Sequence, residues 1–301
     1  MNDPQTHRPV QGVFWMFVTG LLFVAVTALV KYNGTRIPAA ESAFLRYAMG
    51  LVFLLPMINA MRQSTLTRRQ HKLFWLRGVA HTGGVALWFY AMARIPIADV
   101  TAMNYLTPIY VTLGAALFLG EKLALRRILA VVAALVGALI ILRPGFREVG
   151  MGHLAMLFAA VFFATSYLVA KLMSDETNPA IVVTMLSITV TIGLAPLALS
   201  NWVTPTASEL AVLFAVAALA TAGHYTMSMA FAAAPVTVTQ PVSFLQLVWA
   251  VLLGAVVFGE GVDPWVVIGG LVIIGSIAFI TMREAVLKRK IRTPAVPATK
   301  F

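Results

Sequence analysis

The feature that most constrains this chain is its succession of long apolar blocks. A helix needs about 20 apolar residues to cross the hydrocarbon of a bilayer, and ten segments meet this length. Backbone groups in lipid must be hydrogen-bonded within their own segment, so helices are expected rather than open strands. The predicted fold class is an all-α membrane protein with ten transmembrane helices. The spans cover residues 11–31, 39–60, 72–93, 95–119, 124–142, 150–172, 178–199, 208–231, 234–258 and 262–282.

Composition supports the membrane class, because 60% of the 301 residues are hydrophobic and only 11% are charged. A soluble domain carries about 25% charged residues. The chain has no cysteine, which excludes disulfides, thiolate catalysis and cysteine-ligated metals. The net charge of +11 lies in short loops and in the last residues. It therefore indicates orientation in the membrane, and no nucleic-acid partner is expected.

The distribution of basic residues predicts the orientation. Residues 1–10 lack the basic n-region of a signal peptide, so they are expected to form a cytoplasmic N-terminal segment before a retained first span. This arrangement places 15 of the 22 Lys and Arg residues on the cytoplasmic side and five on the opposite side. Cytoplasmic loops carry such an excess. Both termini are thus expected in the cytoplasm, with residues 283–301 as a basic cytoplasmic tail.

An internal repeat relates the two halves of the chain. Pro96 matches Pro235, Leu106 matches Leu245, and Glu121 matches Glu260, all at an offset of 139 residues. Each copy holds five spans, an odd number, so the two copies must face opposite sides of the membrane. Inverted repeats are typical of transporters that alternate access around a central site. The alternative is a duplicated scaffold with another function.

The repeated segments resemble a known family. Residues 91–100 (AMARIPIADV), Pro108, Gly120-Glu121-Lys122 and residues 137–145 (GALIILRPG) resemble an EamA domain. Two such domains, expected at 11–145 and 150–282, make a ten-span member of the drug/metabolite transporter superfamily. The resemblance implies a basket of helices around a central cavity, with spans five and ten at the periphery. It also implies a bacterial inner membrane and a solute such as riboflavin, S-adenosylmethionine, a metallophore or an amino acid.

Two polar stripes are the first candidates for a substrate site. They pair at the repeat offset, with three residues on one face of each helix, and polar groups within a bilayer are functional candidates by default. Their alternative role is hydrogen bonding between helices. The stripes comprise Thr101, Asn104 and Thr107 in span four, and Gln240, Ser243 and Gln246 in span nine.

Charged and aromatic side chains within the spans extend the list. Arg77 and His81 share a helix face; Arg77 is expected to attract an anion or to snorkel, and His81 to change protonation near neutral pH. Arg46 is expected to bind an anion or, with more weight, to make a structural bond to carbonyls or to Glu41. His224 is expected to be structural. Aromatic rings for stacking on a planar solute, or simply for packing, are Trp88, Tyr90 and Tyr105.

Prolines and glutamates mark possible breaks and gates. Pro108 and Pro241 interrupt helical hydrogen bonding in equivalent spans, as helices unwound near a transport site do. Glu121 and Glu260 each follow a glycine near a span end and are expected to cap or gate. No Asp or Glu falls at a predicted midplane, which argues against obligate proton coupling.

Other function classes find less support. An intramembrane enzyme would need convergent catalytic groups, and the sequence has no H-E-x-x-H, G-x-S-x-G or P-loop pattern. A channel would need rings of like groups around an axis. The prediction is a secondary transporter of a small organic metabolite, without cofactor or metal, whose partners are its solute and the lipid bilayer. Small residues in spans five and ten also allow a homodimer.

Overall fold

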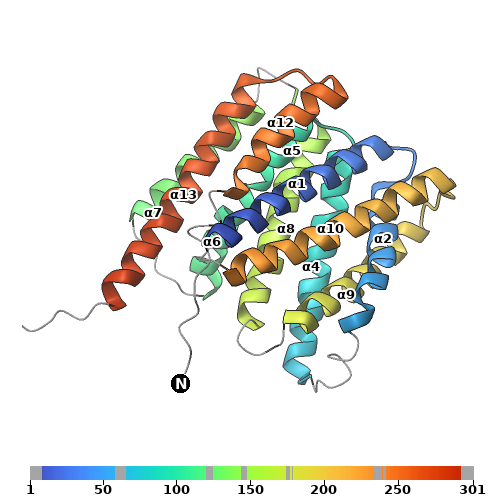
Figure 1. Ribbon diagram of the computed structural model, residues 1–301, viewed down its shortest axis with the longest axis horizontal. Helices are drawn as coiled ribbons and strands as arrows, with labels where there is room; N and C mark the ends of the chain where they lie inside the picture. The colour runs from blue at the N-terminus through green and yellow to red at the C-terminus, as the bar shows by residue number, and fades with distance from the viewer. Residues whose placement is uncertain are drawn as a thin grey trace, which may run out of the picture.

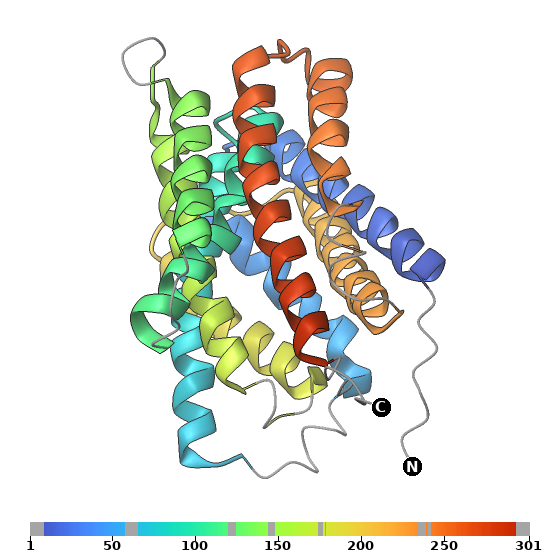
Figure 2. The same ribbon diagram turned by 90° about the vertical axis from the view of Figure 1, so that its left-hand side faces the viewer.

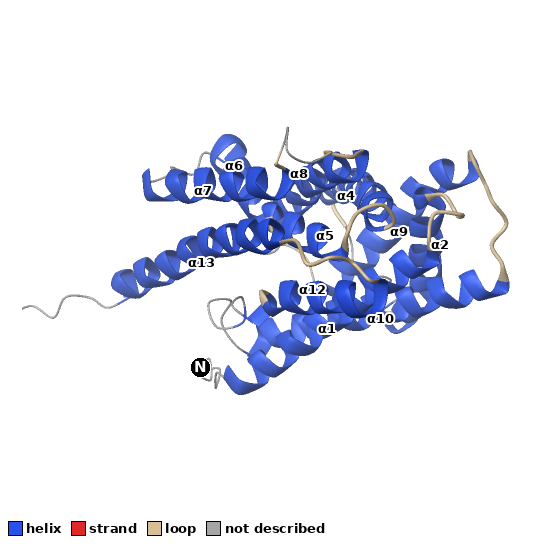
Figure 3. Ribbon diagram, turned by 90° about the horizontal axis from the view of Figure 1, so that it is seen from above, coloured by secondary structure: helices blue, strands red, loops and turns tan. Residues whose placement is uncertain are grey.

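The computed structural model describes residues 9–57, 66–119, 125–143, 148–173, 177, 179–233, 239 and 242–292. No strand occurs within these ranges (Figure 3). The helices are α1 (Pro9–Asn33), α2 (Ala39–Gly50), the 3-10 helix η1 (Leu51–Met57), α4 (Arg68–Met92), α5 (Ile97–Asn104), α6 (Leu106–Leu119), α7 (Leu125–Leu142), α8 (Met151–Met173), α9 (Pro179–Leu199), α10 (Ala207–Ala233), α12 (Leu245–Phe258) and α13 (Pro264–Arg292).

Helix boundaries repeat at the offset found in the sequence. α4 begins at Arg68 and α10 at Ala207, which are 139 residues apart, and α6 and α12 are related by the same offset at both ends. The contacts between helices are also duplicated. α1 packs against α10 as α8 packs against α4, and α2 and α9, the equivalent second helices, pack against each other. The two halves are therefore related by a pseudo-twofold axis.

The predicted span at 95–119 is two helices rather than one. α5 ends at Asn104 and α6 begins at Leu106, with Tyr105 forming a turn between them. Pro108 explains the position of the break, because it has no N–H for the carbonyl of residue 104 and its ring clashes with that carbonyl. Pro108 itself lies in the first turn of α6, where an N–H has no partner within the helix.

One pair of helices stands at the edge of the bundle. α7 and α13, the fifth helices of the two halves, lie side by side there (Figure 1). Their backbones approach closely where Gly137 faces Gly269. A Cβ on Gly269 would lie 2.5 Å from the Gly137 carbonyl oxygen. Small residues permit such close packing of membrane helices.

Several helices have the dimensions of membrane spans. Four of the described helices are long and apolar enough to cross a bilayer, within residues 10–33, 151–170, 181–199 and 207–227. Large apolar side chains face outward, including Phe118 and Val256, as a lipid-facing surface requires. α13 continues to Arg292, beyond the predicted span end at residue 282. α1 begins and α13 ends at their lower ends in Figure 2.

Candidate functional site

A cavity of about 290 Å³ lies at the centre of the bundle. Helices of both halves line it, and its lining on α1 runs from Met16 to Val26, the middle of that helix. A cavity of this size matches the smaller ligand sites of proteins. Ten of the sequence-predicted residues line it: Arg46, His81, Trp88, Asn104, Tyr105, Thr107, Pro108, His224, Ser243 and Gln246.

The polar stripes of the two halves meet in this cavity. Asn104 and Ser243 are equivalent by the repeat, and both line it, as do the equivalent Thr107 and Gln246. Thr107 is buried, and its hydroxyl has no hydrogen-bond partner among the described residues. Gln240 and Pro241, also predicted for this site, lie outside the described residues.

The two broken helices touch at equivalent residues. Tyr105 and Phe244 are related by the repeat offset, and each forms the turn before its helix, α6 or α12. Their rings meet edge to face at 5.7 Å between centres. The Tyr105 hydroxyl also donates to the Ser243 carbonyl oxygen at 3.0 Å. Equivalent residues meet each other only near a twofold axis, so the axis passes beside the cavity.

His81 is held by two side chains from different helices. Its Nδ1 lies 3.2 Å from the Ser166 hydroxyl of α8, and its Nε2 lies 3.1 Å from the Tyr47 hydroxyl of α2. The ring also packs against Phe163. Because both ring nitrogens are hydrogen-bonded, the His81 ring is held in one orientation in the cavity wall. His224 of α10 also lines the cavity, and its ring meets that of Phe23 edge to face.

Arg46 takes a different position from the structural role favoured by the sequence. Its guanidinium carbon lies 4.0 Å from the centre of the Tyr47 ring, and the side chain lines the cavity. Glu41, the expected partner, instead accepts from the backbone N–H of Val203 at 2.9 Å. The predicted bond between Arg46 and Glu41 is therefore not made.

Three other predicted residues lie outside the cavity lining. Arg77 is buried against α9 and donates from Nη1 to the Val182 carbonyl oxygen at 3.2 Å. Tyr90 packs under the guanidinium of Arg94, at 3.7 Å from its ring centre. Thr101 is buried on α5, one turn before the break.

The cavity also contains residues that the sequence did not single out. Tyr47, Phe163 and Tyr167 lie on its wall, and Thr19 of α1 is hydrogen-bonded to Thr226 of α10 at 2.8 Å. The repeat offset gives no signal for them, because their role follows from contacts between helices distant in sequence. Tyr47 follows Arg46 directly in the sequence, and this position beside a candidate residue is the signal that could have identified it.

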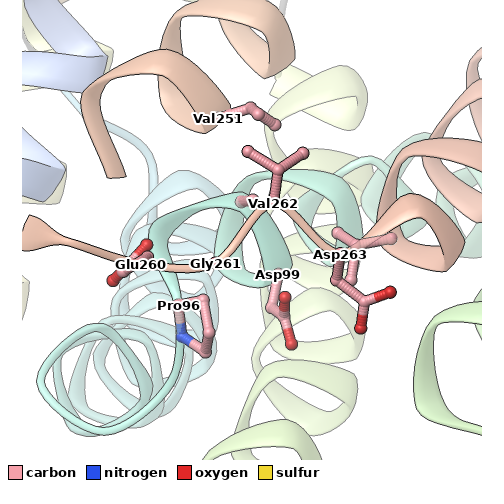
Figure 4. A pocket seen from close by; sticks show the side chains of 9 residues that line it. Pro96, Asp99, Val251, Glu260, Gly261, Val262 and Asp263 are labelled. Carbon is pink, nitrogen blue, oxygen red and sulfur yellow. The ribbon is translucent and has the colours of Figure 1, made fainter. Parts of the chain in front are cut away.

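Glu260 joins three segments at one end of the bundle. α12 ends at Gly259 in the left-handed conformation (φ 62°), which favours glycine. Glu260 then accepts from the Ile97 N–H at 3.0 Å, capping α5, and pairs with Lys31 of α1 at 2.6 Å. Figure 4 shows Glu260 beside Pro96, at the start of α5. Glu121, its predicted counterpart, lies outside the described residues.

A second cavity of about 280 Å³ at this end carries three carboxylates. Each is already engaged: Asp99 with His153, Asp263 with Arg143, and Glu260 as above. Among the described residues, no group of His, Asp and Glu has the arrangement of a metal site. These carboxylates hold helices together.

Ion pairs gather at the same end. Among the described residues, every ion pair joins the first half of the chain to the second. Lys31, Arg36 and Arg143 of these pairs belong to the side that the basic-residue count places outside the cytoplasm. The pairs are Lys31–Glu260, Arg36–Glu209 and Arg143–Asp263, and the hydrogen bond between His153 and Asp99 joins the halves in the same way.

Comparison with known proteins gives one family. A model of the EamA-like transporter family matches residues 10–143 and again residues 150–282. A riboflavin transporter of Vibrio cholerae serotype O1 is 31% identical over 295 residues, covering 96% of this chain and 99% of the relative. An S-adenosylmethionine uptake transporter of Rickettsia bellii is 26% identical, over 94% of this chain and 97% of the relative.

Two further matches agree with these. A pseudopaline exporter of Pseudomonas aeruginosa is 28% identical, over 87% of this chain and 93% of the relative. A crystal structure that is 18% identical superposes with a TM-score of 0.61, covering 94% of this chain and 99% of the matched chain. At that identity the match speaks for the fold alone.

Proposed function

Because the chain belongs to the EamA-like transporter family, and is therefore a multi-pass membrane transporter, we propose that it carries a small organic metabolite by alternating access. The resemblance inferred from the sequence is thereby confirmed. In the proposal, ten spans form two inverted repeats, at 11–145 and 150–282, in a bacterial inner membrane with both termini in the cytoplasm. Riboflavin, S-adenosylmethionine, a metallophore and an amino acid are the candidate solutes.

The observation that carries the proposal is the shared cavity at the axis between the halves. Asn104 and Ser243, equivalent residues of the two repeats, both line it, beside the breaks at Tyr105 and Phe244. Helices interrupted near a midplane site expose backbone and polar groups that can bind a solute. A site on such an axis is reached equally by either half, as rocking of one repeat against the other requires.

The ion pairs support one closed end. They join the halves at the end where Lys31 meets Glu260, whereas the cavity is lined on α1 only as far as Val26, short of Lys31. In the proposal this end is the extracytoplasmic gate, closed in the observed state, and Glu260 is a gating residue. Separation of Lys31 from Glu260 accompanies the opposite state.

Replacement of Asn104 tests the site directly. We expect Asn104→Ala to raise the KM for uptake into reconstituted vesicles about 3- to 10-fold, because one hydrogen bond to the solute is lost. Uptake of radiolabelled riboflavin, S-adenosylmethionine and amino acids would identify the solute before the variant is measured.

Asn201→Ala is the matched control, since Asn201 is exposed beyond α9 and bonds only Ser200 among the described residues. Wild-type kinetics in the Asn104 variant would remove that residue from the site. Single-channel currents without saturable uptake would favour a channel over a carrier.

A further inference from the structure

The cavity holds one permanent charge without an opposite charge. Arg46 lines it, and among the described residues Arg46 has neither a hydrogen bond nor an ion pair; its contact is the Tyr47 ring. None of the described lining residues is Asp or Glu. A charge in a membrane interior is costly unless it is paired, and such residues mark substrate sites.

The geometry around Arg46 favours a flat acceptor group. A guanidinium stacked on an aromatic face keeps its N–H groups along its edge, where they match two adjacent acceptor atoms. Tyr47 is itself fixed, because its hydroxyl bonds His81 at 3.1 Å and His81 bonds Ser166 at 3.2 Å. Arg46 is thus held on a rigid support reaching from α2 through α4 to α8.

Aromatic rings complete the site. Trp88 and Tyr167 line the cavity together with Tyr47 and Tyr105, and such rings provide faces for a planar solute. They also stabilise cations, but Arg46 already occupies the Tyr47 face. A cationic solute would meet Arg46 at close range with no lining carboxylate among the described residues to offset the repulsion.

We propose that Arg46 selects the solute: a planar ring compound, neutral or anionic, that presents paired acceptor atoms such as a carbonyl oxygen beside an unprotonated ring nitrogen, a carboxylate or a phosphate. The inference rests on the proposed carrier function and reduces the number of candidate solutes. Riboflavin, with a flat ring bearing adjacent acceptors and no positive charge, fits. S-adenosylmethionine, which carries a sulfonium and an ammonium group, does not.

The test is a binding titration on the purified, reconstituted chain with probes that differ in charge. Riboflavin and flavin mononucleotide should bind, whereas thiamine, a cation with two aromatic rings, and S-adenosylmethionine should not. Arg46→Met should weaken flavin binding by about tenfold or more, since a charged hydrogen-bond donor is lost. Arg46→Lys should recover part of the affinity, because it restores the charge without the planar fork.

Arg94→Met is the matched control. Arg94 stacks on Tyr90 in the same manner, at 3.7 Å, but is exposed and lies outside the central cavity. Its replacement should leave flavin affinity unchanged. If Arg46→Met does not fold, the charge series on the unaltered protein and the Arg46→Lys variant decide the question.

Each outcome bears on one of the two proposals. Absence of flavin binding, equally tight binding of thiamine or S-adenosylmethionine, or wild-type affinity in Arg46→Met overturns the role of Arg46. Vesicle uptake is measured in parallel. Flavin binding without uptake overturns the carrier function and supports the Arg46 inference, whereas saturable uptake with unchanged binding in Arg46→Met overturns the inference and supports the carrier.

Discussion

At the scale of residues, the cavity depends on a layer of side chains behind its surface. Ser166 has no exposed surface, yet it bonds His81, which bonds the tyrosine that supports Arg46. Ser166 belongs to the second half of the chain, and the other residues belong to the first. The position of the cavity's permanent charge therefore depends on the contact between α4 and α8.

This arrangement predicts an effect of Ser166→Ala on solute affinity. The variant leaves His81 Nδ1 without its partner, loosening the support of Tyr47, and a hydrogen bond is worth about 1 kcal/mol, or roughly fivefold in KM. Uptake kinetics in vesicles provide the measurement.

Thr165→Ala is the control from the next position. Thr165 is exposed, and its hydroxyl donates to the Val161 carbonyl oxygen of its own helix. The KM for uptake by the Thr165→Ala variant should therefore stay at the wild-type value. Equal KM values in both variants would show that Ser166 plays no part in positioning.

The sequence predicted part of this site, for a physical reason. Asn104, Ser243, Thr107 and Gln246 stand out because polar residues are rare in apolar spans and recur at the repeat offset. For Arg46 the sequence slightly favours a structural bond, to carbonyls or to Glu41, over a role in the site. In the structure, Glu41 instead accepts a hydrogen bond from the N–H of Val203, 162 residues away. No local sequence pattern encodes such a contact.

At the scale of elements, the sequence predicts where helices lie but not the residue at which one of them breaks. The positions of α4, α8 and α10 follow from apolar length. The break at Tyr105 did not follow from length, although Pro108 predicted an interruption in that span. A proline acts on the carbonyl four residues before it, so the helix ends before the proline instead of at it.

The close contact between α7 and α13 predicts opposite effects for one substitution at two glycines. In Gly269→Ala, the new Cβ would lie 2.5 Å from the Gly137 carbonyl oxygen, so the helices must separate at a cost of about 1–3 kcal/mol. The thermal unfolding temperature in detergent should fall.

Gly275→Ala on the same helix is its counterpart. A Cβ at Gly275 meets no atom within 4 Å, and alanine favours a helix by up to about 1 kcal/mol over glycine. Its unfolding temperature should hold or rise. A fall of the same size in both variants would mean that the contact between Gly137 and Gly269 does not limit stability.

At the scale of the whole molecule, two halves with matching helix starts and matching contacts enclose one cavity. The repeat itself can be recognised in the sequence, because the residue types at 96, 106 and 121 recur 139 positions later. Their spatial relation required the structure. The contact between Tyr105 and Phe244 reveals the axis, and no sequence pattern specifies that these two rings touch.

The inverted arrangement that we propose for the two repeats predicts that equivalent positions face opposite sides of the membrane. Arg68 and Ala207 begin the equivalent helices α4 and α10, and both are exposed. Because the chain has no cysteine, Arg68→Cys and Ala207→Cys each introduce a single reactive thiol. In intact cells, a membrane-impermeant maleimide should label the thiol at 207 and should reach the thiol at 68 only after permeabilisation. Labelling of both from one side would rule out inverted repeats.

The asymmetry at Arg46 has a consequence for how such a chain can arise. Leu186, which packs against the core, occupies the matching place in the second half, counted from the first residues of α2 and α9. A half-length ancestor that paired with an identical copy would have brought two guanidinium groups to one cavity, where they repel. Fusion of the two copies into one gene removes that constraint. It lets natural selection keep a single cation and use the other half as an apolar wall.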